Sequence, residues 1–264
     1  MRSVSWMPDW TALMRAAQAI ALPDGPGFVY FVTDSHLGGA SSPEFIAMLR
    51  GLSEARAVIF LGDLFQVWLA LPKYWDAVVL DVLEGFRSLQ AAGTRTVFVA
   101  GNREFFLPGT AEAVRRSGLP FDAVVPGAAV LTWAGRRYGL THGDLVNRRD
   151  AQYLKWRRLS RSPAFAWLFR AMPGGIARRI AQRLERGLSA TNLEIKIQYP
   201  LDELEAFAGA VLPGLDGFFI GHFHRDELIS VPGQKGALRI VPDWLSRKQV
   251  LRMAPDGRVQ TLRP

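Results

Sequence analysis

Short apolar runs of strand length, each closed by glycine or a turn-forming residue, recur through the first half of the chain. They occupy residues 27–34, 57–63 and 94–102. Between them, residues 42–55 and 74–93 place apolar side chains at helical spacing, and Gly93 is suited to end the second helix. Strands that alternate with helices in this way predict a parallel sheet covered by helices.

The pattern changes to paired strands in the second half. Residues 128–144 contain two apolar runs joined at Ala134 and Gly135, which predicts an antiparallel hairpin. Further strands are expected within 214–224, 226–233 and 237–244, and a last hairpin within 248–264 turns at Asp256 and Gly257. This order predicts an α/β fold, a sandwich of two mixed sheets flanked by helices.

Composition narrows the class of protein. A chain of 29.3 kDa with 49% hydrophobic residues can bury a substantial core, and we expect one domain over residues 1–264. The absence of cysteine excludes disulfides, thiolate nucleophiles and cysteine-ligated metals, and is compatible with a reducing cytoplasm. Asp9 and Arg15 interrupt the N-terminal apolar stretch, so residues 1–25 predict a short leading helix and no export signal. No run approaches the roughly 20 apolar residues of a membrane span.

Positive charge is concentrated in one segment. The formal charge of +8 favours an anionic partner, namely nucleic acid, a phosphorylated substrate or an acidic membrane surface. Residues 145–200 hold twelve lysines and arginines against three acidic residues, a net of +9. Residues 162–172 and 173–188 mix these arginines with apolar residues and predict two amphipathic helices, broken at Pro173 and Gly174.

Residues 147–200 therefore form a basic helical insertion, with two interpretations. The insertion is a lid over acyl chains and an anionic headgroup that touches the bilayer surface, or it is a helical pair packed on the sheet with a solvated basic face. The large local charge favours the lid, since a purely structural helix pair seldom needs it.

Polar side chains gather at the predicted carboxyl ends of the strands, which meet in one crevice of an open α/β sheet. Seven of them, including all four histidines of the chain, are Asp34, His36, Asp63, Asn102, His142, His222 and His224. Their spacing fits βαβ units of about 30 residues. Imidazole and carboxylate without thiolate suit zinc, manganese or iron, and seven ligands suit two divalent ions that share one carboxylate.

The GHFH sequence at 221–224 places two histidines one residue apart. In an extended segment, residues two apart face the same way, so His222 and His224 are expected to point into the site and each take one ion. Any one of these motifs alone is more often a turn or a satisfied polar residue. Five motifs in order, which use every histidine, predict a metal centre.

At these residues the chain resembles the calcineurin-like metallophosphoesterases, whose signature combines D-x-H, GD, GN, a later HGD and GH-x-H. The resemblance implies a bridging hydroxide that attacks phosphorus in line, and Asp63 as the carboxylate shared by both ions. It implies one ion on Asp34, His36, Asp63 and His224, and the other on Asp63, Asn102, His142 and His222.

Two positions depart from the usual pattern of that family. Gln66 stands where many members have a second acid, and Arg103 stands where most have the histidine taken to protonate the leaving group. Arginine does not donate a proton usefully at neutral pH, but it binds phosphate and neutralises developing charge. Such a site favours leaving groups that depart without protonation, for example a phosphate leaving from a pyrophosphate.

Arg103, the GDLFxxW sequence, RRDAQY after HGD and the basic insertion resemble one branch of the family, the UDP-2,3-diacylglucosamine pyrophosphohydrolases of lipid A synthesis in Gram-negative bacteria. This resemblance implies cleavage to UMP and the acylated glucosamine 1-phosphate, by a peripheral enzyme on the cytoplasmic face of the inner membrane. It implies Mn2+ as the metal and a glycolipid nucleotide as substrate. Catalysis would involve Asp63, Asn102, Arg103 and His142, and substrate binding Asn102, Arg103, Asp150 and Tyr153. Glu104 replaces the usual aspartate of GNRD, so a divergent member or a paralogue stays open.

Two other functions stay open on the sequence. One is another two-metal phosphodiesterase, nuclease or phosphomonoesterase, whose basic insertion would bind nucleic acid. The other is a membrane- or partner-binding scaffold without turnover, which would not need seven intact ligands. Arg103 and the apolar content of the insertion favour the glycolipid over nucleic acid. The sequence does not fix the oligomeric state.

Overall fold

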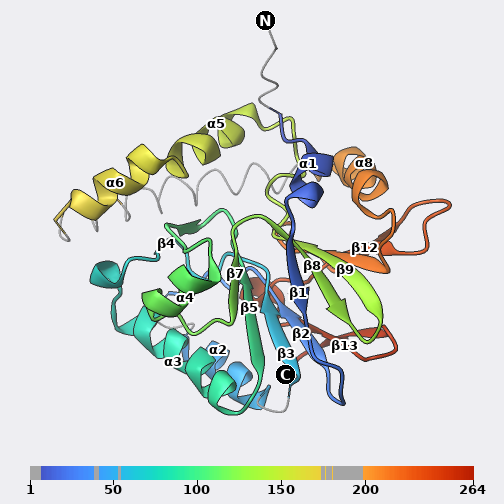
Figure 1. The fold of residues 1–264 in the computed structure, drawn as a ribbon, viewed down its shortest axis with the longest axis horizontal. Helices are drawn as coiled ribbons and strands as arrows, with labels where there is room; N and C mark the ends of the chain where they lie inside the picture. The colour runs from blue at the N-terminus through green and yellow to red at the C-terminus, as the bar shows by residue number, and fades with distance from the viewer. Residues whose placement is uncertain (1–6, 39–41, 53–54, 174–175, 177–179, 181–198) are drawn as a thin grey trace, which may run out of the picture.

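Two six-stranded mixed sheets pack face to face in a computed structural model of the chain, as the sequence predicts (Figure 1). The structure describes residues 7–38, 42–52, 55–173, 176, 180 and 199–264. Most of the helix predicted over 173–188, with its arginines, lies outside the described residues. No helix in the described ranges is long and apolar enough to cross a membrane.

The first sheet carries the predicted parallel strands. Its order is β14 (Val259–Leu262), β13 (Val250–Met253), β2 (Val29–Val32), β3 (Ala57–Phe60), β5 (Arg95–Val99) and β7 (Ala123–Val125). Strands β2, β3, β5 and β7 run parallel, and β7 was not predicted from the sequence. All four residues of β3 are buried, as expected for a central strand covered on both faces.

Two helices cover the outer face of this sheet, α2 (Ser42–Gly51) and α3 (Ala77–Ala91). Helix α3 begins where the Asp76 carboxylate accepts a hydrogen bond from Val79 N, at 3.0 Å. It ends just before Gly93, whose φ of 87° is left-handed, so the predicted stop is confirmed.

The second sheet contains the predicted hairpin and one strand that was not predicted. Its order is β1 (Gln18–Ala21), β8 (Ala128–Trp133), β9 (Arg136–Thr141), β10 (Gly217–Ile220), β12 (Ala237–Ile240) and β11 (Glu227–Ser230). The β8–β9 turn has left-handed backbone at Ala134 and Gly135, the geometry of a tight hairpin. Helices α1 (Trp10–Arg15) and α8 (Leu201–Val211) pack against this sheet. The N-terminal segment thus forms the expected short helix and then adds an edge strand, β1.

The inner faces of the two sheets form a continuous apolar core. Phe31 of β2 and Phe219 of β10 stack across it with ring centroids 4.0 Å apart. Both strands end at the same edge of the sandwich, so the loops that follow them meet there. This packing brings together loops that lie almost 190 residues apart in the sequence.

The insertion begins with two helices that run along one end of the molecule, α5 (Ala151–Ser160) and α6 (Pro163–Ala171) (Figure 1). Helix α6 matches one predicted amphipathic helix, whereas α5 was not predicted. The short elements β4 (Trp68–Leu69), η2 (Pro72–Tyr74), β6 (Glu104–Phe105) and α4 (Ala111–Ser117) complete the described part near it. Tyr74 donates a hydrogen bond to Phe169 O at 2.6 Å, which ties the end of α6 to η2.

Candidate metal centre

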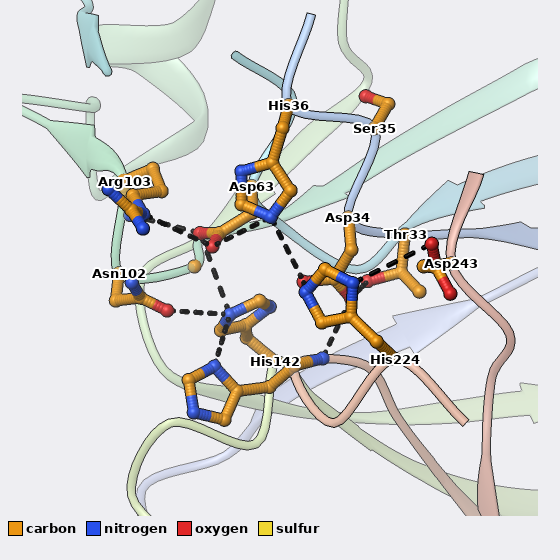
Figure 2. A network of polar contacts seen from close by, with 12 residues as sticks. Thr33, Asp34, Ser35, His36, Asp63, Asn102, Arg103, His142, His224 and Asp243 are labelled. Carbon is orange, nitrogen blue, oxygen red and sulfur yellow. Dashed lines mark hydrogen bonds and ion pairs between the residues drawn. The ribbon is translucent and has the colours of Figure 1, made fainter. Parts of the chain in front are cut away.

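The seven residues singled out in the sequence meet at one edge of the sandwich (Figure 2). Asp34, Asp63 and Asn102 follow β2, β3 and β5 of the first sheet, and the later histidines follow β9 and β10 of the second. The loops of both sheets therefore contribute to a single polar cluster, as the strand-end positions predict.

Asp34 lies at the middle of this cluster and is fully buried. Its Oδ2 accepts hydrogen bonds from Thr33 Oγ1 at 2.6 Å and from His222 N at 2.7 Å. Its Oδ1 lies 3.8 Å from His36 Nε2 and 3.6 Å from His224 Nε2. Burial raises the pKa of Asp34, but the three neighbouring histidines and Thr33 lower it by a larger amount, so the carboxylate is ionised.

Asp63 lies between the two groups of histidines. Its Oδ1 is 3.5 Å from His142 Nε2 and accepts a hydrogen bond from Arg103 N at 2.9 Å. Its Oδ2 is 3.8 Å from His36 Nε2. One oxygen thus faces each side of the cluster, which is the arrangement a carboxylate shared by two cations requires.

His142 Nε2 faces two atoms that carry lone pairs. Its Nδ1 lies 2.6 Å from the carbonyl oxygen of Leu61, which can only accept, so Nδ1 carries the proton. In the neutral ring, Nε2 then faces Asn102 Oδ1 at 2.9 Å and His222 Nδ1 at 3.2 Å. Burial lowers the pKa of His142, but the carboxylates of Asp63 and Asp34 raise it more, to about 9. The position therefore attracts positive charge, and a divalent cation at Nε2 can take the place of a second proton there.

His36 and His222 are held neutral. Burial lowers the pKa of His36 despite its two carboxylate neighbours. Burial and the nearby His142 lower the pKa of His222 to about 4. Neutral imidazole is the form that binds metal ions, so these rings offer nitrogen lone pairs at neutral pH.

Two sets of three side chains can each hold a cation, with ligand atoms that all lie within 4.8 Å of one another. One set is Asp34, His36 and His224, and the other is Asp34, Asp63 and His142. Asp34 Oδ1 and His36 Nε2 are buried and have no hydrogen-bond partner in the described structure, as expected for atoms that ligate a metal. The donor set fits two divalent cations that lie close together.

Left-handed backbone occurs at five of the seven candidate ligands. Their φ values are 49° at Asp34, 42° at His36, 58° at Asp63, 70° at His222 and 52° at His224. The GHFH segment is consequently not extended, and the explanation that its two histidines face the same way along a strand is wrong. Both side chains reach the cluster because the chain turns at each of them. Such conformations are costly and concentrate at functional sites.

Gly62 and Gly101 allow two ligand loops to touch. A Cβ atom on Gly62 would lie 2.6 Å from Gly101 N, and one on Gly101 would lie 2.3 Å from Asp63 Oδ1. No side chain fits at either position without moving the backbone that carries Asp63. This is the close approach that glycine makes possible.

Glu104 joins the same two loops and was identified in the sequence only as a departure from the usual aspartate. Its buried carboxylate accepts hydrogen bonds from the backbone N–H groups of Gly101, Asp63 and Leu64, at 2.7, 3.1 and 2.9 Å. Burial and the Asp63 charge raise its pKa to about 7. Glu104 thereby holds Asp63 in its left-handed conformation.

Replacing Glu104 with alanine leaves three buried N–H groups without their acceptor. We expect the free energy of unfolding of the metal-free protein to fall by about 3 kcal/mol, as the loss of buried hydrogen-bond partners predicts. Urea denaturation measures this value. Glu104→Asp keeps the charge on a shorter side chain, and we expect a smaller loss. Equal stability of wild type and Glu104→Ala would contradict this role.

Arg103 and Gln66 occupy the two positions that depart from the family pattern. The Arg103 side chain is 1% exposed, and its Nε lies 3.8 Å from Asp63 Oδ2 (Figure 2). Gln66 donates from Nε2 to the backbone oxygen of His36 at 3.0 Å, so it supports a ligand loop through the main chain.

Asp150 and Tyr153 lie at the start of α5, and Tyr153 contacts the loop that carries His142. The Asp150 carboxylate caps the helix by accepting from Tyr153 N at 2.8 Å. The Tyr153 hydroxyl donates to the carboxylate of Asp144, which also pairs with Arg157 Nε at 2.7 Å. Asp144 follows His142 by two residues, and the sequence gave no sign of its role. These contacts tie the insertion to the loop that carries His142.

Arg161 adds a second tie between insertion and site. Its guanidinium donates to the backbone oxygens of Gly101 at 2.5 Å and Pro126 at 3.1 Å. The sequence alone did not rank the arginines of the insertion. Among the insertion arginines that the structure describes, Arg157 and Arg161 reach the metal-centre loops.

Comparison with known proteins places the chain among known hydrolases. No family model matches the sequence. A UDP-2,3-diacylglucosamine hydrolase of Ralstonia nicotianae is 31% identical over 232 residues, which cover 83% of this chain and 84% of that protein. One of Stenotrophomonas maltophilia is 32% identical over 244 residues, 86% and 95% of the two chains. The solved structure of an archaeal phosphodiesterase aligns with 89% of this chain and 98% of that chain, at 11% identity and a TM-score of 0.47.

The fold and the buried ligand cluster define a calcineurin-like metallophosphoesterase. Sequence relatedness extends over most of this chain and most of each relative. Within that class, the chain belongs to the family of these relatives, the UDP-2,3-diacylglucosamine hydrolases.

Proposed function

We propose that the protein hydrolyses the pyrophosphate of UDP-2,3-diacylglucosamine and releases UMP and 2,3-diacylglucosamine 1-phosphate. The names of its relatives support this substrate. The observation that carries the proposal is Arg103, which lies buried beside Asp63 at the position where a proton donor would otherwise act. A phosphate group that leaves from a pyrophosphate needs charge neutralisation more than it needs a proton.

The proposed roles of the side chains follow from their positions. Two divalent cations, which we take to be Mn2+, would supply an activated water for in-line attack on phosphorus. Asp34, Asp63 and the histidines would hold these cations, with Asn102 and His142 on the side that faces His222. Arg103 would bind the pyrophosphate and stabilise the charge that develops on the departing phosphate.

The insertion is the proposed lid over the lipid part of the substrate. Aromatic side chains of α5 and α6 face β4 and β6, where Phe169 packs with Leu69 and Phe105. Trp156 and Phe165 extend this apolar cluster. The proposed contribution of Asp150 and Tyr153 is to fix the start of α5, through Asp144 and Arg157.

The outer face of the insertion supports contact with a membrane surface. Trp167 is 69% exposed on α6, and Leu168 is exposed beside it. Arg158 on α5 and Arg170 on α6 are also exposed. Exposed aromatic and aliphatic side chains among arginines are typical of a helix that lies in the interface of an anionic bilayer. A peripheral location on the inner face of the inner membrane follows from this proposal.

A matched pair of leucines tests the membrane contact. Leu168 on α6 and Leu80 on α3 are both 47% exposed. We expect Leu168→Ala to weaken binding to vesicles with anionic lipid about fivefold, because roughly 1 kcal/mol of apolar burial is lost. Leu80→Ala should bind like wild type in the same sedimentation assay. Equal binding by both variants would place the membrane contact elsewhere.

The central experiment is incubation of the purified protein with Mn2+ and UDP-2,3-diacylglucosamine, followed by detection of UMP. Single-stranded nucleic acid under the same conditions tests the competing nuclease function. We expect UMP from the glycolipid and no cleavage of the nucleic acid. Cleavage of the nucleic acid without release of UMP would instead assign the site to a nuclease.

A further inference from the structure

The segment after β12 lies beside the candidate metal centre and carries a buried carboxylate, Asp243. Val241 N donates to Ile220 O at 2.7 Å, so this segment runs beside the end of β10, just before the GHFH loop. A short helix, α9 (Trp244–Arg247), follows directly. Asp243 is 1% exposed and has no part in the ligand sets described above.

The start of α9 is fixed against the loop of the first ligand. Trp244 N donates to Thr33 O at 3.0 Å, and Leu245 N donates to Asp34 O at 3.1 Å. The Trp244 side chain is buried and packs edge to face on Phe45 of α2, with ring centroids 5.9 Å apart. These backbone hydrogen bonds therefore fix the position of the Asp243 backbone relative to Asp34.

The Asp243 side chain lies between the start of α9 and His224 (Figure 2). Its Oδ2 caps α9 by accepting from Ser246 N at 2.6 Å, and the same oxygen lies 3.6 Å from His224 Nδ1. The other nitrogen of that ring, Nε2, lies 3.6 Å from Asp34 Oδ1 within the cation set. The two ring nitrogens thus face two different carboxylates, one outside the ligand set and one inside it.

From this geometry we infer that Asp243 is a positioning residue, which orients His224 so that Nε2 faces the first cation. The inference rests on the proposed metal-dependent function. A carboxylate can accept a hydrogen bond from Nδ1–H but cannot donate one, so the neutral ring keeps its lone pair on Nε2. Partners of this kind fix both the tautomer and the angle of a metal-binding histidine. His142 receives the same support from a carbonyl oxygen, that of Leu61.

Three variants separate this role from helix capping. Asp243→Ser keeps an oxygen that caps α9 well but removes the carboxylate from His224. Asp243→Asn keeps the shape and an acceptor oxygen without the charge. Asp76→Ser is the matched control. Asp76 caps α3 by accepting from Val79 N, so this variant makes the same substitution at the start of a different helix.

Titration of metal-free protein with Mn2+ in a calorimeter gives the first readout. We expect wild type to bind two ions. In Asp243→Ser one of the two should bind about 10–100-fold more weakly, the usual effect of losing such a partner, and Asp243→Asn should lie between. The Asp76→Ser control should bind both ions like wild type. Circular dichroism shows that each variant is folded.

Nitrogen NMR of histidine gives a second readout, since the chain has only four histidines. In the zinc-loaded wild type, His224 should carry its proton on Nδ1, whereas Asp243→Ser should show a mixture of tautomers. Unchanged Mn2+ affinity in folded Asp243→Ser, or equal weakening of both ions, would overturn the inference. Failure of wild type to release UMP would overturn the proposed function instead, so the two results are distinguishable.

Discussion

Replacing Asp63 with alanine should lower turnover by at least about 10³-fold, the upper range for removing one preorganised electrostatic group. No other candidate ligand has one carboxylate oxygen toward His142 and the other toward His36, at 3.5 and 3.8 Å, among the contacts of the described residues. The cation set with Asp34 and His142 would lose a ligand, and the set with His36 would lose a neighbouring carboxylate oxygen. The measurement is the rate of UMP release at saturating Mn2+.

The Asp63→Ala chain should stay folded, since the apolar core between the sheets does not include this side chain. Its loss leaves Arg103 N without an acceptor, at a cost of about 1–3 kcal/mol. Asp81→Ala, at an exposed position of α3, is the control for a general effect of losing a carboxylate. His142→Ala should behave like Asp63→Ala. Metal-dependent hydrolysis retained by both purified variants would overturn the site assignment.

Most of the fold follows from the periodicity of apolar residues. The buried run of β3 and the helical spacing of α3 are strong signals, because each buries a whole face. Strand β1 was missed because only one of its four residues, Ile20, is buried. A short edge strand of this kind leaves almost no period in the sequence.

The candidate ligands were found because they stand where strands end, which is a local property. Their left-handed backbone was not predicted. Glycine is the residue that signals such a conformation, and these positions hold Asp and His. The roles of Glu104 and Asp243 were missed for another reason. Their partners lie 41 and 19 residues away, at Asp63 and His224, so only tertiary packing reveals their roles.

Buried carboxylates organise the site in successive layers. Asp34 and Asp63 face the proposed cations, while Glu104 fixes the loop of Asp63 through backbone N–H groups. Asp144 fixes the insertion through Arg157. This division explains why the left-handed ligand loops persist, since each is held by contacts from a neighbouring loop.

Replacing Arg103 with alanine should have different effects on two kinds of substrate. We expect pyrophosphate cleavage to slow by about 10²–10³-fold, the range for loss of one preorganised charge-stabilising group. Hydrolysis of an activated aryl phosphodiester should slow by less than about tenfold, because its leaving group disperses its own charge. The ratio of kcat/KM for the two substrates measures this difference.

Two further variants separate charge from shape at this buried position. Arg103→Met fills a similar volume without charge, and it should match Arg103→Ala in the substrate ratio. Arg103→Lys keeps the charge but lacks the planar fork that pairs with phosphate, so it should restore part of the pyrophosphate activity. Equal losses on both substrates in Arg103→Met would mean that the side chain acts through Asp63, whose Oδ2 lies 3.8 Å from its Nε, and not on the pyrophosphate.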